Sequence, residues 1–145
     1  MKNLIALCCC IISIVGLAIN VQANNSSYLH QLTIVPLQST GVIHVDTIQE
    51  PNVLEVDHKV SESDVYVECF VNGFHFNQNK VGSLHQENEG HIRLYINDEH
   101  VDTLYQPAFI IRDLPKGEYE VKVVIVKNDR SPYDMEETFT ITIPQ

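Results

Sequence analysis

The sequence predicts an all-β domain, folded as a single antiparallel sandwich of about seven strands. Successive short runs alternate apolar and polar residues at the two-residue period of a β-strand. Clusters rich in Ser, Asn, Asp, Pro and Gly separate these runs and predict turns. No helical apolar stripe of useful length follows residue 23, so we expect strands alone to build the core.

The first 23 residues have the pattern of a secretory signal peptide. Lys2 is followed by an almost wholly apolar run over residues 4–19, and Val21 and Ala23 occupy the two positions that signal peptidase reads. We expect cleavage after Ala23. A retained membrane anchor is the alternative, although a run of about 16 residues is short of the ~20 that span a bilayer. A lipoprotein signal fits less well, because Leu7 precedes Cys8 where a small residue is needed.

Charge excludes some classes of partner. The chain of 145 residues carries 19 acidic and 9 basic side chains, for a formal charge of −10. Such a surface repels nucleic-acid phosphates and anionic lipid headgroups. Beyond the signal region Cys69 is the one cysteine, so no disulfide forms within the domain and the hydrophobic core must stabilise it. We expect no stable membrane span once the signal is cleaved.

We divide the chain into the signal peptide (1–23), an N-terminal extension (24–52) and the sandwich (53–145). In the extension, short apolar runs flank a polar turn at residues 38–41, which predicts a β-hairpin. In the sandwich, every second side chain of each strand is expected to point inward. The runs that carry this alternation are 53–56, 65–71, 92–96, 119–125 and 139–143.

The most specific local pattern covers residues 114–123. Leu114 and Pro115 lead into a turn at Gly117, and Tyr119 then opens an alternating strand. This order is typical of a tyrosine corner, in which the ring enters the core and the hydroxyl bonds a backbone group across the turn. An ordinary strand-initiating tyrosine is the alternative.

From about residue 53 to residue 143 the chain resembles immunoglobulin-like or fibronectin-type-III-like domains of bacterial exported envelope proteins. The resemblance rests on Gly73-Phe74-His75-Phe76, on the Gly90-His91 pair that opens the strand ending at Asn97-Asp98, and on residues 114–123. It implies an Ig-like sandwich, with residues 24–52 as an added β-rich extension. Some relatives of this general shape are associated with copper handling, but fold alone licenses no activity.

Four histidines suggest a copper or zinc site. His75, His85, His91 and His100 lie in the central region, with Glu87 and Glu89 between two of them, and imidazoles and carboxylates ligate both metals. No His-x-His or Cys-x-x-Cys pair occurs, and Cys69 falls within a strand. The favoured interpretation is a set of surface histidines and no cofactor, with metal handling as the alternative function.

Catalysis has little support in the sequence. No nucleophile-elbow pattern and no Gly-rich phosphate loop is present. A hydrolase would need an exposed Cys69 beside a histidine, whereas the alternation around Cys69 predicts burial. We therefore predict that the protein is not an enzyme.

A binding role remains as the main hypothesis. Sandwich domains bind through end loops or an edge strand, and Tyr95, Asp129 and Tyr133 are the candidate contacts, with the loop 128–133 expected to be exposed. Phe109 is expected in the core. The sequence thus predicts a secreted or cell-envelope interaction module whose partner is a protein or small ligand outside the cytoplasm.

Overall fold

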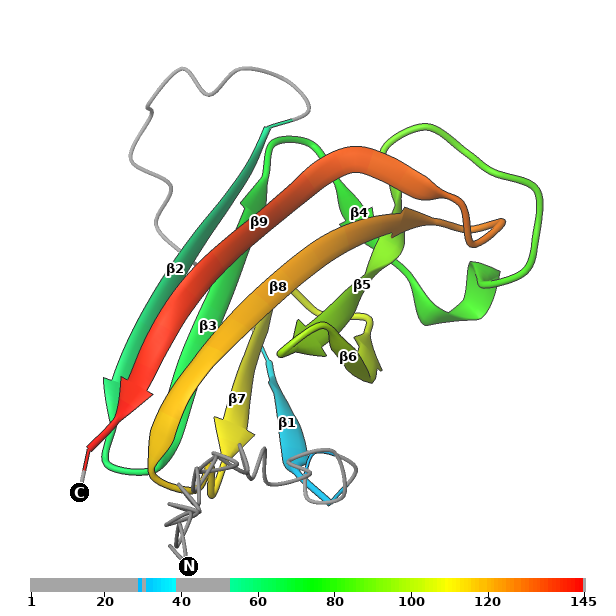
Figure 1. Ribbon diagram of the computed structural model, residues 1–145. Helices are drawn as coiled ribbons and strands as arrows, with labels where there is room; N and C mark the ends of the chain where they lie inside the picture. Colours follow the sequence, from blue (N-terminus) through cyan, green and yellow to red (C-terminus); the bar gives the residue numbers. More distant parts are fainter. Residues whose placement is uncertain (1–28, 30, 39–52, 145) are drawn as a thin grey trace, which may run out of the picture.

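The computed structural model describes residues 29, 31–38 and 53–144 (Figure 1). The predicted signal peptide, most of the predicted turn at 38–41 and the second run of the predicted hairpin lie outside these residues. In the part described, no helix has the length and apolar character needed to cross a bilayer.

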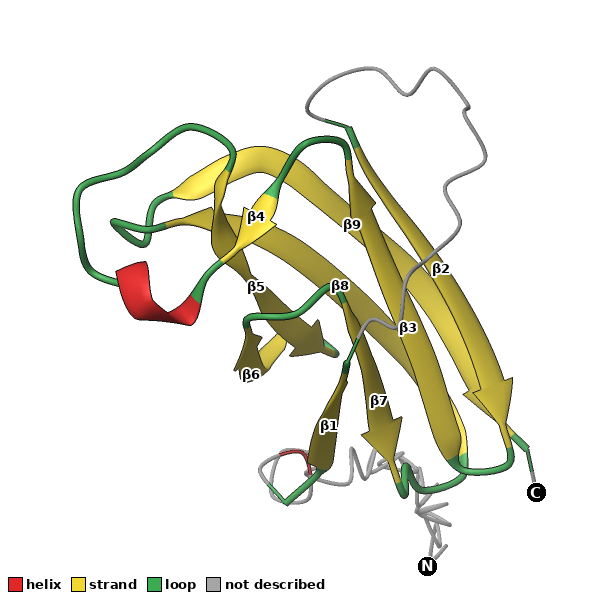
Figure 2. Ribbon diagram, turned by 180° about the vertical axis from the view of Figure 1, so that it is seen from behind, coloured by secondary structure: helices red, strands yellow, loops and turns green. Residues whose placement is uncertain are grey.

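Two β-sheets pack face to face, which confirms the predicted all-β sandwich (Figure 1, Figure 2). Neighbouring strands are antiparallel, except that β4 and β5 run parallel. Sheet 1 has the order β1 (Thr33–Leu37), β7 (Ala108–Arg112), β3 (Asp64–Val71) and β2 (Leu54–Ser61). Sheet 2 has the order β4 (His75–Phe76), β5 (Glu89–Ile96), β8 (Gly117–Lys127) and β9 (Pro132–Ile143), and β6 (Glu99–Leu104) also pairs with β5.

The described residues therefore form more strands than the about seven expected from sequence. One addition is β1, which falls in the predicted extension and pairs along its whole length with β7 at the edge of sheet 1. The other is the two-residue β4, which leads into a 3₁₀ turn, η1 (Gln78–Lys80). The side chain of Asn77 caps η1 by accepting a hydrogen bond from the amide of Asn79, at 3.0 Å.

The chain passes repeatedly between the sheets. It forms β2 and β3 in sheet 1, crosses to sheet 2 for β4 to β6, returns to sheet 1 for β7, and crosses again for β8 and β9. Such crossings are the Greek-key connectivity of antiparallel sandwiches. On one side the edge strands β2 and β9 approach each other, and the rings of His58 and Phe139 stack with centroids 4.2 Å apart.

The core consists of the side chains that the two-residue period assigns to the inside. Phe109 is fully buried, as expected, and the inward residues of β3, β5 and β8 interdigitate between the sheets. Cys69, the cysteine among the described residues, is free, so the burial of these side chains stabilises the described domain without a disulfide. The inward residues of these three strands include Val65, Val67, Cys69, Ile92, Leu94, Ile96, Tyr119, Val121, Val123 and Ile125.

The alternation breaks near the end of β8. Val124 and Val126 point to the outer face of sheet 2, yet Val126 is fully buried and Val124 nearly so. On β5, His91 pairs with Val126 and Gly90 pairs with Lys127, and a Cβ at Gly90 would overlap the carbonyl oxygen of Val126. Position 90 therefore has no room for a side chain, and glycine there lets β5 lie close against β8.

Candidate functional site

A cleft of about 500 Å³ opens at the end of the sandwich where β3, the loop after η1 and the β8–β9 turn meet. Most of the lining residues are polar types that carry both signs of charge, and Tyr133 and Met135 are among them. Clefts with a few convergent polar groups are the usual form of small-ligand and peptide sites. The lining residues are Asn72, His85, Glu87, Asn88, Lys127, Tyr133, Asp134 and Met135.

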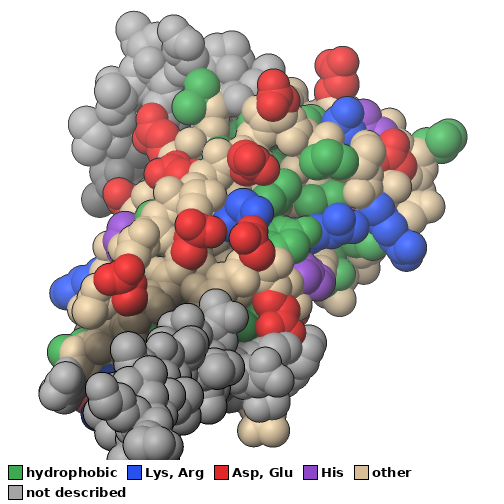
Figure 3. All heavy atoms as spheres, in the orientation of Figure 1, with side chains coloured by type: hydrophobic (Ala, Val, Ile, Leu, Met, Phe, Trp, Pro, Cys, Tyr) green, Lys and Arg blue, Asp and Glu red, His purple; other side chains and the backbone are tan. Residues whose placement is uncertain are grey.

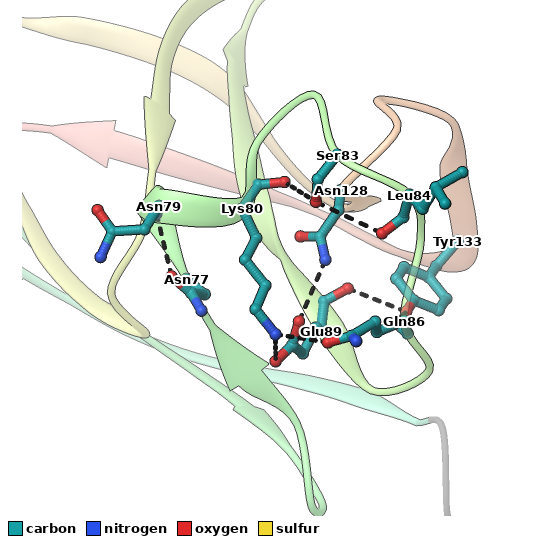
Figure 4. Close-up of polar contacts among 9 residues, drawn as sticks. All are labelled: Asn77, Asn79, Lys80, Ser83, Leu84, Gln86, Glu89, Asn128 and Tyr133. Carbon is teal, nitrogen blue, oxygen red and sulfur yellow. Dashed lines mark hydrogen bonds and ion pairs between the residues drawn. The ribbon is translucent and has the colours of Figure 1, made fainter.

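A hydrogen-bonded network fastens the loop to the β8–β9 turn (Figure 4). Lys80 Nζ lies 2.9 Å from Glu89 Oε1 and also donates to Gln86 Oε1, while Asn128 Nδ2 donates to Glu89 Oε2 at 3.2 Å. The bond from Lys80, followed by that from Asn128, holds the pKa of Glu89 below its usual value. A further bond joins the loop to the turn, because the backbone amide of Gly82 donates to the carbonyl oxygen of Asn128 at 2.6 Å.

Tyr133 ties the start of β9 into the same network. Its hydroxyl donates to the carbonyl oxygen of Glu89 at 3.1 Å and lies 3.4 Å from Nε2 of His85. Its ring meets the rings of His85 and Phe74 edge-on, and Lys127 Nζ lies 5.3 Å from the ring centroid. Burial raises the pKa of Tyr133 above its usual value.

The four histidines of the metal hypothesis lie in different surroundings. His85 is in the cleft, His75 is exposed on β4, and exposed His100 on β6 contacts the ring of Tyr95. The expectation of surface histidines is wrong for His91, which is 2 % exposed beside the ring of Tyr105. Among the described residues, no three His, Cys, Asp or Glu side chains stand close enough together to hold a metal ion.

The three predicted binding residues separate into two regions. Tyr133 lies in the cleft, and Asp129 lies in the adjoining turn, where its carboxylate accepts hydrogen bonds from the amide and hydroxyl of Ser131. Those bonds lower the pKa of Asp129. Tyr95 lies elsewhere, on the outer face of sheet 2, where Lys122 Nζ is 5.3 Å from its ring centroid. The cleft end thus contains Tyr133 and His85, with Asp129 next to them.

The loop 128–133 is exposed at residues 129–132, as expected. The expectation is wrong only for Asn128, which is fully buried and whose Oδ1 has no hydrogen-bond partner. Its side-chain NH₂ and backbone carbonyl both hold the neighbouring loop, which explains the burial.

Cys69 does not have the surroundings of a nucleophile. Its side chain is 2 % exposed, and burial, followed by the charges of Glu137 and Glu68, raises the pKa of the thiol to about 12. The thiol is therefore protonated at neutral pH and packed in the core, as the strand alternation predicts.

Sequence reasoning missed Leu84, the most exposed large apolar side chain among the described residues. It is 90 % exposed at the tip of the loop and points away from the network (Figure 4). The available signal was its place in a largely polar stretch from Asn77 to Glu89, where Val81 is the other aliphatic residue. The network residues Lys80 and Asn128 were also missed, since nothing in sequence spacing joins positions 48 apart. 

No family model and no curated protein matches the sequence. Among solved structures, the fold is similar to a Clostridium perfringens spore cortex lytic enzyme, SleM, with TM-score 0.45 and 11% identity over 63% of this chain. The match covers 28% of that enzyme. It is also similar to fibronectin(III)-like modules of Clostridium thermocellum CbhA, with TM-score 0.40 and 10% identity over 61% of this chain and 96% of that one.

The fold is identified by the chain's own geometry. The strands cross between the sheets in Greek-key order. At the start of β8 the ring of Tyr119 is buried, and its hydroxyl bonds the carbonyl oxygen of Pro115. With these features, the chain is a β-sandwich of the immunoglobulin-like and fibronectin-type-III-like architecture.

Proposed function

We propose that this protein is an exported, non-enzymatic binding module that holds a polypeptide partner at the cleft end of the sandwich. The single observation that carries the proposal is Leu84, whose side chain is 90 % exposed next to the cleft. Burial of such a side chain by a partner would remove its apolar area from water, which favours association.

The attachment of the loop supports this role. The bonds of Lys80 and Asn128 to Glu89, and of Gly82 to the Asn128 carbonyl, hold both ends of the segment that carries Leu84. A loop already fixed on a rigid sheet loses little conformational entropy when it binds. Leu84 therefore acts as a preorganised anchor, with the polar cleft as its rim.

The buried, protonated Cys69 supports a role without covalent catalysis. The signal-like pattern of residues 1–23 supports export, and it favours a partner outside the cytoplasm, either free or in the cell envelope. The formal charge of −10 makes an anionic membrane surface the less favoured partner.

Peptides selected from a phage-displayed library of random peptides test the proposal, with the purified exported chain as bait. Selected peptides are then titrated into isotope-labelled protein, and shifted backbone amides are mapped by NMR. We expect shifts at residues 84–88 and 127–135. Leu84→Ser should weaken binding about tenfold or more, as loss of an interface anchor does.

Tyr66→Ser is the matched control, because Tyr66 is also an exposed large side chain but lies on sheet 1. It should change the affinity less than about twofold. Peptides that map to the sheet faces, or that bind Leu84→Ser as tightly as the native protein, would overturn the proposal.

A further inference from the structure

The one Asn-Gly pair of the chain lies at the cleft. Asn72 and Gly73 follow β3, and the amide of Phe74 donates to the carbonyl oxygen of Val71 at 3.2 Å, which closes a β-turn around the pair. Gly73 has a φ of 68°, a left-handed conformation that glycine adopts without strain. Asn72 is one of the residues that line the cleft.

The surroundings of this pair favour a reaction between its two residues. Asparagine deamidates most readily before glycine, because glycine has no side chain to hinder the approach of its amide nitrogen to the preceding side-chain carbonyl carbon. Both residues are exposed, and a Cβ placed on Gly73 would meet no atom within 4 Å. Within the described part of the chain, no backbone carbonyl accepts a hydrogen bond from the amide of Gly73. The attacking nitrogen is therefore accessible and is not held by the fold.

Two other asparagines at this end of the sandwich lack these features. Asn88 also lines the cleft, but the next amide in the chain, that of Glu89, donates to the carbonyl oxygen of Gln86 at 3.3 Å. Asn128 is fully buried, and its side-chain NH₂ donates to Glu89. Sequence and structure together therefore distinguish Asn72 from its neighbours.

We propose that Asn72 is a site of spontaneous deamidation, which places a new carboxylate in the wall of the cleft. The amide nitrogen of Gly73 loses its proton and attacks Cγ of Asn72, and the new N–Cγ bond closes a five-membered succinimide. The side-chain nitrogen takes up a proton and leaves as ammonia. Water then opens the ring at either carbonyl and gives aspartate or isoaspartate at position 72. The net change is the gain of one water and the loss of one ammonia, so no oxidant or reductant is needed.

Deamidation changes the charge of the cleft. Glu87 and Asp134 already line it against one ammonium group, that of Lys127, and the product adds a third carboxylate. Acidic side chains are also spread over the face of the molecule seen in Figure 3, in keeping with the formal charge of −10. The deamidated cleft should therefore bind cationic peptides more tightly and anionic peptides more weakly. This consequence rests on the proposed function, whereas the deamidation itself does not.

Peptide mapping by mass spectrometry tests the reaction, after the folded protein has been incubated at neutral pH and physiological temperature. We expect position 72 to deamidate at least about tenfold faster than position 88, which is the internal control in the same cleft. The rate at position 72 should lie within about tenfold of the rate in a synthetic peptide of residues 70–76. Protection of Asn72 to the level of Asn88 would overturn the proposal.

Ion-exchange chromatography gives a second readout, because the product carries one more negative charge. The acidic form that accumulates in the native protein should be absent from Asn72→Gln, since glutamine cannot form the five-membered ring. It should persist in Asn88→Gln, which makes the same change elsewhere in the cleft. An acidic form that persists in Asn72→Gln at the native rate contradicts the proposal.

Asn72→Asp supplies a uniform product for the binding test. Cationic and anionic members of the selected peptides are titrated into it, and their affinities should rise and fall, respectively, by about twofold or more. Asn79→Asp is the charge-matched control, because Asn79 is exposed on η1 and does not line the cleft. Equal effects of the two substitutions refute a specific effect on the cleft. If no peptide is selected, the proposed function fails, and the mass spectra still decide whether Asn72 deamidates.

Discussion

The hydroxyl of Tyr119 donates a hydrogen bond to the carbonyl oxygen of Pro115, 2.8 Å away. This bond spans the turn between β7 and β8 while the ring lies in the core at 4 % exposure. Tyr119→Phe keeps the ring and removes the bond, so the free energy of unfolding should fall by about 1 kcal/mol. Urea unfolding measures the change. Tyr66→Phe, at a half-exposed position on sheet 1, is the control and should be nearly neutral.

Gly90 allows β5 and β8 to approach each other. A Cβ at position 90 would overlap the carbonyl oxygen of Val126 and press on the ring of Phe74. Because both neighbours are fixed, we expect Gly90→Ala to destabilise the fold by about 1–3 kcal/mol. Gly73→Ala meets no atom within 4 Å and isolates the effect of a positive φ, here 68°. If thermal unfolding shows Gly90→Ala to be the milder change, the close approach of the strands is not what requires glycine.

The ion pair between Lys80 and Glu89 should make the attachment of the loop depend on pH. The pKa of Glu89 is lowered in the folded protein, mainly by its bond from Lys80, so the stabilisation is present above the ordinary carboxyl pKa. It is lost as the pH falls through the lower, folded-state value. The measurement is hydrogen-exchange protection of the Gly82 amide, which bonds the Asn128 carbonyl.

At neutral pH, Glu89→Gln should reduce that protection, because the charge that Lys80 pairs with is gone. Glu87→Gln is the control, since Glu87 is an exposed carboxylate of the same loop. Equal effects of the two substitutions would mean that general loop charge, and not the network, holds the segment.

The thiol of Cys69 should react slowly in the native protein. With a pKa of about 12 the thiolate population at pH 8 is smaller than that of an ordinary thiol by a factor on the order of 10³. A chromogenic disulfide reagent should therefore label Cys69 slowly in buffer and rapidly in urea. A matched Leu84→Cys variant places a thiol at the exposed tip and should label fast without denaturant. Fast native labelling of Cys69 would return the hydrolase hypothesis to consideration.

The burial of His91 should destabilise the fold in acid. Its pKa is lowered in the folded state, so the unfolded chain binds more protons as the pH falls through the ordinary histidine value. The stability associated with neutral His91 is thus complete above that value and declines toward the folded pKa. His91→Phe removes the titrating group, and its free energy of unfolding should rise relative to the native protein between about pH 7 and pH 5. Parallel stability curves for the two proteins contradict this prediction.

The sequence alone determined which side chains face the core. The two-residue alternation in β3, β5 and β8 assigned Val67, Leu94 and Val121 inward, and the structure confirms them. The Leu-Pro-x-Gly pattern before Tyr119 likewise indicated a tyrosine corner, because the residues that make it are neighbours in the chain. The alternation of apolar residues along a strand and the residues of a turn can be recognised in the sequence without knowing which strands pair.

Only the tertiary structure decided what covers the outer face of sheet 2 and what fastens the cleft. Val126 and His91 alternate as outward residues, yet both are buried. Asn128, expected in an exposed loop, is buried where it bonds Glu89, 39 positions earlier. Strand pairing and sheet packing between residues far apart in the sequence decide whether an outward side chain is buried and which loops touch. The alternation of residues within one strand does not contain this information.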